Sequence, residues 1–216
     1  MKKVALIGAS GFVGSAILRE LLDRGHEVTA IVRNPEKVNV RHTALNVVKA
    51  DVAHTDTLAE ICRGQAALIS AYNPGWTNPP IYEETLRNYP RILEAAKRSG
   101  VPHLLCVGGA GTLFCTPGLR VVDSGAIPAE IMGGVKSLGE FYLNTLAHER
   151  DTDWVFFSPA GTLEPGERTG KFRLGKGDLI VDANGKSHIS MADYAMAMED
   201  ELEKPAHHYE RFTIGY

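Results

Sequence analysis

The feature that most constrains the fold is a glycine-rich turn that directly follows the first apolar run of the chain. Val4 to Ile7 are continuously apolar, which is typical of a short strand buried on both faces. Residues 12–24 then place apolar side chains at helical spacing, and Gly25 marks the end of that helix. A strand, a tight turn and a helix in this order predict the opening of a βαβ unit, and therefore a mainly parallel sheet.

The turn itself has the spacing G-x-x-G-x-x-G, formed by Gly8, Gly11 and Gly14. In this context the first glycine permits the turn, the second lets a pyrophosphate approach the backbone, and the third lets helix and strand pack closely. The helix that follows offers free N–H groups and a partial positive charge. We therefore expect a dinucleotide cofactor to contact the whole turn: Gly8, Ala9, Ser10, Gly11, Phe12, Val13 and Gly14. A P-loop is excluded because Val13 occupies the place of its second glycine, and the G-x-S-x-G elbow of serine hydrolases occurs nowhere.

Strand-like and helix-like segments alternate along most of the chain. The predicted strands are 4–7, 27–32, 44–48, 66–71, 103–107 and 154–157, and the predicted helices lie within 12–24, 57–63, 83–99, 128–149 and 191–203. This alternation predicts an α/β fold with a doubly wound sheet and helices on both faces.

Beyond Ser158 the alternation stops and turn residues become frequent. We expect 172–174 and 179–181 to form a small hairpin outside the main sheet, and 212–214 to add an edge strand. The chain is thus expected to be one domain, 1–216, in which 162–188 forms a small lobe on the substrate side.

Composition narrows the class of protein. The 23 basic and 26 acidic residues give a net charge of −3, which argues against a nucleic-acid or membrane surface built on bulk charge. The three cysteines are an odd number without a C-x-x-C pair, so we predict neither disulfides nor a zinc site, and a cytoplasmic location. His207 and His208 are adjacent and so do not face one site as a helical i,i+4 pair would; no metal ligand is assigned. The expected partner is a small-molecule substrate, and no oligomeric state is predicted.

The end of the second strand bears on which cofactor is bound. An acid there usually accepts from the free ribose 2′-hydroxyl of NAD, but the only acid, Glu27, lies at the opposite end and Arg33 follows the strand. Arg33 would attract a 2′-phosphate, so NADP is favoured and NAD is the alternative. Asp51 and Val52 end the loop after the third strand and are expected to contact the cofactor. The Asp51 carboxylate either accepts from the adenine amino group or caps the helix that starts near residue 55. The residues that end the fourth strand are also expected to line the cofactor crevice: Ser70, Ala71 and Tyr72.

The sequence resembles the atypical short-chain dehydrogenase/reductase superfamily, and within it the small single-domain NAD(P)-binding proteins labelled NAD-dependent epimerase/dehydratase or NADH-flavin reductase. The residues that carry the resemblance span nearly the whole chain: 8–14, 33–35, 51–52, 108–111, 158–160 and 190–195. The resemblance implies a Rossmann fold, cofactor contacts that include Pro159, and an active site of Ser, Tyr and Lys.

The chain departs from that active site at two of its three positions. Lys136 matches the Lys, which in the superfamily binds ribose hydroxyls, but Met132 stands at the Tyr position and Ala110 at the Ser position. Thr112 is the preferred substitute hydroxyl. Three functions follow: an NADPH-dependent reductase of a flat conjugated acceptor that needs no protein acid, a non-catalytic nucleotide-binding redox sensor, or an epimerase/dehydratase acting on a sugar nucleotide.

Overall fold

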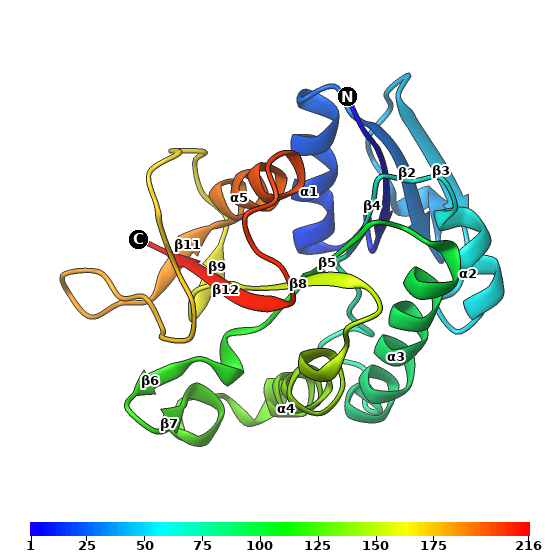
Figure 1. Cartoon of the computed structure of the whole chain (residues 1–216). Helices are drawn as coiled ribbons and strands as arrows, with labels where there is room; N and C mark the ends of the chain where they lie inside the picture. The colour runs from blue at the N-terminus through cyan, green and yellow to red at the C-terminus, as the bar shows by residue number, and fades with distance from the viewer.

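A computed structural model describes all residues 1–216 and is built around one eight-stranded sheet (Figure 1). The strand order is β10-β12-β8-β5-β4-β1-β2-β3, and every pair except β10–β12 is parallel. The bounds are β1 Lys3–Ile7, β2 Glu27–Val32, β3 Leu45–Lys49, β4 Ala67–Ser70, β5 His103–Val107, β8 Asp153–Ser158, β10 Arg173–Gly175 and β12 Glu210–Gly215. Since β1 lies between β2 and β4, the strand order reverses at the end of β1, where the glycine turn lies.

Helices cover both faces of this sheet, as the alternating pattern predicts. α1 (Phe12–Asp23) and α5 (Met191–Glu203) lie side by side on one face, and α2 (Thr55–Cys62), α3 (Ile81–Ser99) and α4 (Ala129–Asn144) cover the other (Figure 1). The apolar side chains of β1 alternate between two cores: Val4 and Leu6 face α1 and α5, whereas Ala5 and Ile7 face α2 and α3. The doubly wound fold class is therefore confirmed.

The C-terminal third differs from the expected pairing. β10 lies beside β12 in the main sheet, so 172–174 does not form a separate hairpin and 212–214 is not the edge. Residues 179–181 form no strand; Leu179 instead donates its N–H to the carbonyl of Phe114 at 2.8 Å. The physical reason is that β10 covers an edge that β12 would otherwise expose to solvent.

Two small sheets complete the chain. β9 (Thr162–Glu164) pairs in parallel with β11 (His188–Ser190), and β6 (Phe114–Thr116) forms an antiparallel hairpin with β7 (Leu119–Arg120). Phe114 also bridges to Asp178, so the hairpin after β5 contacts the 162–188 segment.

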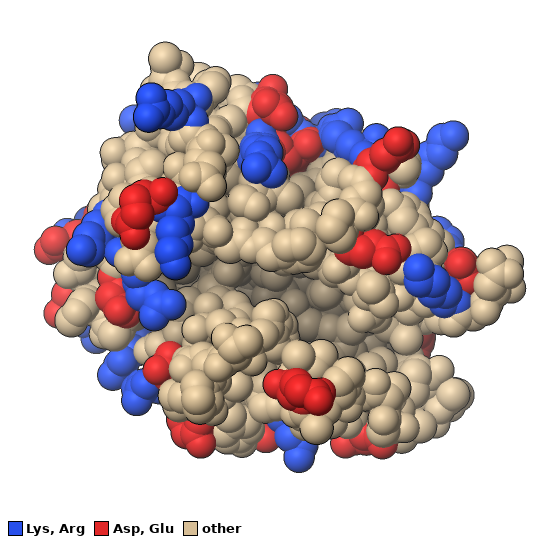
Figure 2. Space-filling view, turned by 180° about the vertical axis from the view of Figure 1, so that it is seen from behind, with Lys and Arg blue, Asp and Glu red and all other residues tan.

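Basic and acidic side chains are interspersed over the face that Figure 2 shows. Figure 2 shows one face that is hollowed near its middle, with mostly uncharged atoms inside the hollow and charged side chains around its rim. No helix of the structure combines the length and the apolar character that crossing a lipid bilayer requires.

Candidate functional site

The glycine turn after β1 is so closely packed that two of its three positions exclude any side chain. Gly8 has a φ of +82°, and a Cβ there would lie 2.4 Å from the carbonyl oxygen of Ala71. A Cβ on Gly14 would lie 2.1 Å from the carbonyl oxygen of Gly8, because α1 leaves the turn directly against the strand end. Gly11 is less restricted, at 3.2 Å from the same oxygen, and is exposed. The first and third glycines thus have the packing roles that the sequence predicts.

The N-terminus of α1 is open to an anion. No side chain caps the helix, and its first turn contains no acidic residue. Ser15 is the first helix residue whose N–H donates within the chain, to the carbonyl of Gly11 at 2.9 Å. The N–H groups of residues 12–14 are therefore left without an acceptor in the chain, and Ser10, Gly11 and Phe12 are exposed beside them. These observations fit a pyrophosphate, which would accept from these N–H groups.

An open polar cavity of about 350 Å³ lies at the carboxyl ends of β2, β3 and β4. Its lining comes from three strand ends and from one face of α3: Arg33, Asp51, Ala53, Tyr72, Glu84, Arg87, Asn88 and Arg91. Arg33 is exposed and makes no hydrogen bond or ion pair within the chain. The structure therefore brings Arg33, Asp51 and Tyr72 together, although they are separated in sequence.

Asp51 closes a turn and does not cap α2. Its Oδ1 accepts from the N–H of Ala53 at 2.8 Å, whereas α2 begins after His54 without a side-chain cap. The alternative that Asp51 caps that helix is wrong. Its carboxylate still lines the cavity, while the neighbouring Val52 is buried in the core.

Tyr72 is held by two residues of α3. The amide of Asn88 donates to the Tyr72 hydroxyl at 2.7 Å, and the Tyr89 hydroxyl donates to the Tyr72 carbonyl at 2.7 Å. Burial raises the pKa of the Tyr72 phenol above its usual value, so the phenol stays protonated at neutral pH. Ser70, by contrast, is fully buried, and its hydroxyl has no hydrogen-bond partner.

Four lining residues on α3 escaped the sequence analysis. Glu84, Arg87, Asn88 and Arg91 follow the spacing i, i+3, i+4 and i+7, which places them on one face of the helix. The sequence shows these four residues as a polar face of the helix. Only the folded structure shows that this face lines one cavity with Arg33, the residue that follows β2.

The second part of the predicted site lies on α4. The Lys136 side chain is exposed and makes no hydrogen bond or ion pair, and Met132 precedes it by one helical turn. Two residues before Lys136, Gly134 packs so closely on the indole of Trp76 that a Cβ would lie 2.7 Å from the ring. The absence of a side chain at Gly134 thus lets α4 approach Trp76 of the β4–α3 loop.

Thr112 lies next to α4 but is buried. Its Oγ1 accepts from the guanidinium of Arg211 at 2.8 Å, and its methyl group lies 3.0 Å from where a Cβ on Gly139 would stand. Burial lowers the pKa of Arg211, whose guanidinium lies 5.2 Å from the ring centre of Tyr142. The roles of Lys136 and Thr112 stay predictions, as does that of Pro159, which directly follows β8 and is half-buried.

Comparison with known proteins identifies the family. A family model described as NAD(P)H-binding matches residues 8–205, which begin at the first glycine of the turn. The chain belongs to this NAD(P)H-binding family. The resemblance to the small branch of the atypical short-chain dehydrogenase/reductase superfamily is confirmed.

Three similar proteins span all or nearly all of the chain. YwnB of Bacillus subtilis, itself uncharacterized, is 40% identical over 98% of this chain and 97% of its own length. A crystal structure of a candidate epimerase from Bacteroides thetaiotaomicron is 59% identical, has a TM-score of 0.95, and covers 100% of this chain and 97% of its own. A candidate NADH-flavin reductase from Streptococcus pneumoniae is 32% identical, with a TM-score of 0.82 and coverage of 100% and 99%.

Proposed function

We propose that the protein is an NADPH-dependent reductase that transfers hydride to a flat conjugated acceptor. The observation that carries the proposal is Arg33, an arginine without any ion pair in an open cavity beside the glycine turn. A guanidinium in that place favours a cofactor with a 2′-phosphate, since it offers a planar fork of donors to phosphate oxygens. The name of the Streptococcus structure supports a reductase.

Each part of the site has a role in this proposal. The N–H groups of residues 12–14 bind the diphosphate, the cavity between Arg33 and Asp51 receives the adenosine half, and Lys136 binds ribose hydroxyls. A bound nicotinamide supplies the hydride. The chain positions the acceptor and excludes water from the reacting atoms.

The chain offers no phenol at the usual position of the proton donor. The Met132 side chain has no transferable proton, and Ala110 has no hydroxyl. We therefore infer an acceptor that takes its proton from water once it has been reduced, as flavins and quinones do. Trp76, which is half exposed beside α4, and the 162–188 lobe with Phe114 are the proposed walls of the acceptor site.

Oxidation of NADPH, followed by its absorbance, tests the reaction with FMN and a quinone as acceptors. We expect turnover above the rate without protein, and Trp76→Ala is expected to raise the KM for the acceptor at unchanged affinity for NADPH. Leu119→Ala, an exposed apolar residue of β7, is the control and is expected to leave both unchanged. A rate equal to background with every acceptor would remove the reductase assignment.

The cofactor preference has its own test. Arg33→Glu is expected to weaken NADPH binding by at least about tenfold and to leave NADH binding within about twofold, because only NADPH carries the phosphate. Arg41→Glu changes the net charge equally, lies outside the cavity, and is exposed, so it is the matched control. An unchanged ratio of the two affinities in Arg33→Glu would show that Arg33 does not contact a 2′-phosphate.

A second candidate function is a redox sensor that binds the nucleotide without turnover. The absence of a phenol at Met132 and of a hydroxyl at Ala110 favours it. The same absence disfavours the epimerase or dehydratase function suggested by the name of the Bacteroides structure, since those reactions move a proton through that phenol. Binding of both NADPH and NADP⁺ without oxidation of NADPH by any acceptor would support the sensor.

We also propose a cytoplasmic location, supported by three cysteines that remain free thiols.

A further inference from the structure

A cluster of two histidines and one aspartate lies at the amino ends of the strands, away from the glycine turn. His103 is the first residue of β5 and Asp153 the first residue of β8, and the two are paired in register. His208 stands two residues before β12, the strand on the other side of β8. The glycine turn lies at the carboxyl end of β1, so the cluster and the proposed cofactor site lie at opposite ends of the strands.

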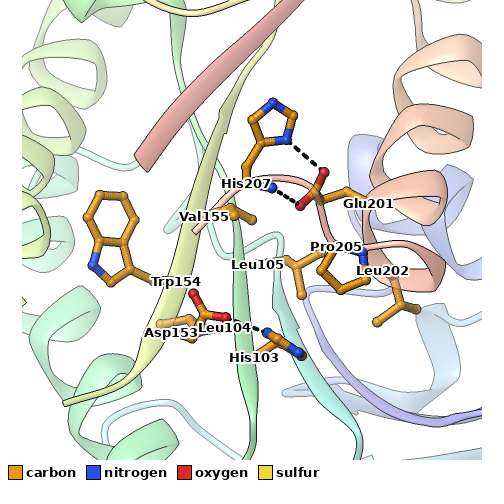
Figure 3. Close-up of a pocket in the computed structure, with 10 residues that line it drawn as sticks. All are labelled: His103, Leu104, Leu105, Asp153, Trp154, Val155, Glu201, Leu202, Pro205 and His207. Carbon is orange, nitrogen blue, oxygen red and sulfur yellow. Dashed lines mark hydrogen bonds and ion pairs between the residues drawn. The ribbon is translucent and has the colours of Figure 1, made fainter. Parts of the chain in front are cut away.

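The three side chains converge on one point. The Nδ1 atoms of His103 and His208 each lie 2.8 Å from the same oxygen of Asp153, Oδ2. One potential ligand atom from each residue lies within 4.8 Å of the other two. Figure 3 shows the His103 and Asp153 side chains directed toward each other at the edge of a small pocket.

The carboxylate of Asp153 has no cationic partner. Its side chain is 17% exposed, and its ion-pair partners are the two imidazoles, with no Lys or Arg within 4.0 Å. Its second oxygen, Oδ1, is buried and accepts no hydrogen bond. A mostly buried carboxylate is costly unless it is compensated, and a cation shared with the two imidazoles would compensate its charge.

The backbone around His208 is fixed in an unusual conformation. Tyr209 is the only residue other than glycine with a positive φ, at 54°, and its N–H donates to the carbonyl of Trp154 at 2.9 Å. His207, the residue before His208, points away from the cluster. Its Nδ1 lies 2.7 Å from Oε2 of Glu201, and its ring stacks on Phe212. The adjacent histidines therefore do not share a site, as the sequence indicates, but His208 joins residues that are distant in sequence.

A second group of possible ligands does not offer the same chemistry. His26 lies between Glu199 and Glu203, but its Nδ1 accepts from the N–H of Lys2 at 3.0 Å. Its proton is therefore on Nε2, the atom that faces the two carboxylates, and no lone pair is left there for a metal. No such backbone donor occupies a ring nitrogen of His103 or His208.

We propose that His103, Asp153 and His208 bind one Zn²⁺ ion. Two imidazole nitrogens and one carboxylate oxygen are ligands that zinc prefers, and water would take the fourth, solvent-facing position. At metal–ligand distances of about 2.0–2.1 Å, tetrahedral ligands are about 3.3 Å apart, so the 2.8 Å pairs must open by about half an ångström. The ion would tie the segment between α5 and β12 to the starts of β5 and β8. The site is independent of the proposed reductase function.

Calorimetric titration of the untagged chain, first treated with a chelator, tests the site with ZnCl₂ and, separately, with MgCl₂. We expect one Zn²⁺ per chain with a Kd below about 10 µM, and no Mg²⁺ binding at that concentration, because the ligands include two nitrogens. His208→Gln and Asp153→Asn are expected to weaken zinc binding at least about tenfold. His54→Gln, an exposed histidine outside the cluster, is the matched control and is expected to bind as the wild type does.

Thermal unfolding provides a second readout. His208 is half exposed, so His208→Gln is expected to fold, and its Tm without zinc should match that of the wild type within about 2 °C. Zinc should raise the Tm of the wild type and of His54→Gln but not that of His208→Gln. A wild-type Kd above about 10 µM, or zinc binding by His208→Gln equal to that of the wild type, would overturn the proposal.

Discussion

At the scale of single residues, the fold and the proposed cofactor site both depend on the absence of a Cβ at Gly14. Gly14→Ala would place a Cβ 2.1 Å from the carbonyl oxygen of Gly8, so the helix and the turn must separate. We expect this variant to lose about 2 kcal/mol or more of unfolding free energy and to bind NADPH at least about tenfold more weakly. Urea unfolding and a fluorescence titration measure the two effects.

Ser15→Ala is the control for that substitution, because Ser15 is the next residue and its hydroxyl bonds only the carbonyl of Phe12. It is expected to change stability by less than about 1 kcal/mol and to leave NADPH binding unaltered. A Gly14→Ala protein as stable as Ser15→Ala would contradict the close approach described for the turn.

The three cysteines differ in reactivity because only one thiol reaches solvent. Burial raises the pKa of Cys62 and of Cys106 to about 12, whereas Cys115 is exposed in β6. At pH 8 the folded protein should therefore react rapidly with one equivalent of a disulfide reagent such as DTNB, and the unfolded protein with three. Cys115→Ser should abolish the rapid reaction. Rapid modification of a second thiol in the folded chain would show that the core under α2, α3 and α4, which contains both buried thiols, is open.

At the scale of elements, the packing of α5 against α1 buries a carboxyl group whose titration should affect stability. Glu199 is 1% exposed, and burial raises its pKa from 4.5 to about 8. Between these values the folded chain holds a proton that the unfolded chain has released, so stability falls as pH rises through that window. We expect Glu199→Gln to lose less stability than the wild type between pH 5 and pH 8, by on the order of 3 kcal/mol.

Urea unfolding at pH 5, 6.5 and 8 measures that difference. Glu60→Gln, an exposed glutamate on α2, should follow the wild type at every pH. Parallel pH profiles for Glu199→Gln and the wild type would mean that Glu199 is ionised in the folded protein, where its Oε1 lies 2.8 Å from His26 Nε2.

The sequence predicts elements well where one local pattern decides them. The glycine turn is visible in the spacing of its glycines, and the buried strands and the helices in the spacing of their apolar residues. The structure has these elements within a few residues of the predicted bounds. The pairing of β10 could not be predicted in the same way. Its three residues carry no pattern that distinguishes a separate hairpin from a strand on the edge of β12, and the choice depends on an edge created by tertiary folding.

At the scale of the whole molecule, the two ends of the parallel strands carry different chemistry. The glycine turn and the open cavity lie at the carboxyl ends, and the histidine–aspartate cluster lies at the amino ends. Sequence reasoning found the residues that directly follow strands, such as Arg33 and Asp51, because strand ends can be located locally. It missed Arg87 and Arg91 of α3, and it missed the meeting of His208 with Asp153, because these depend on how distant elements pack.

The central claim is that the end of β1 and the N-terminus of α1 together bind the diphosphate of a pyridine nucleotide. Calorimetric titration of the wild-type chain with NADPH and with NADH tests it most directly. The account predicts one nucleotide bound per chain and tighter binding of NADPH. Absence of binding heat with both nucleotides at several temperatures, together with no change in Tm at millimolar concentrations of either, would contradict it.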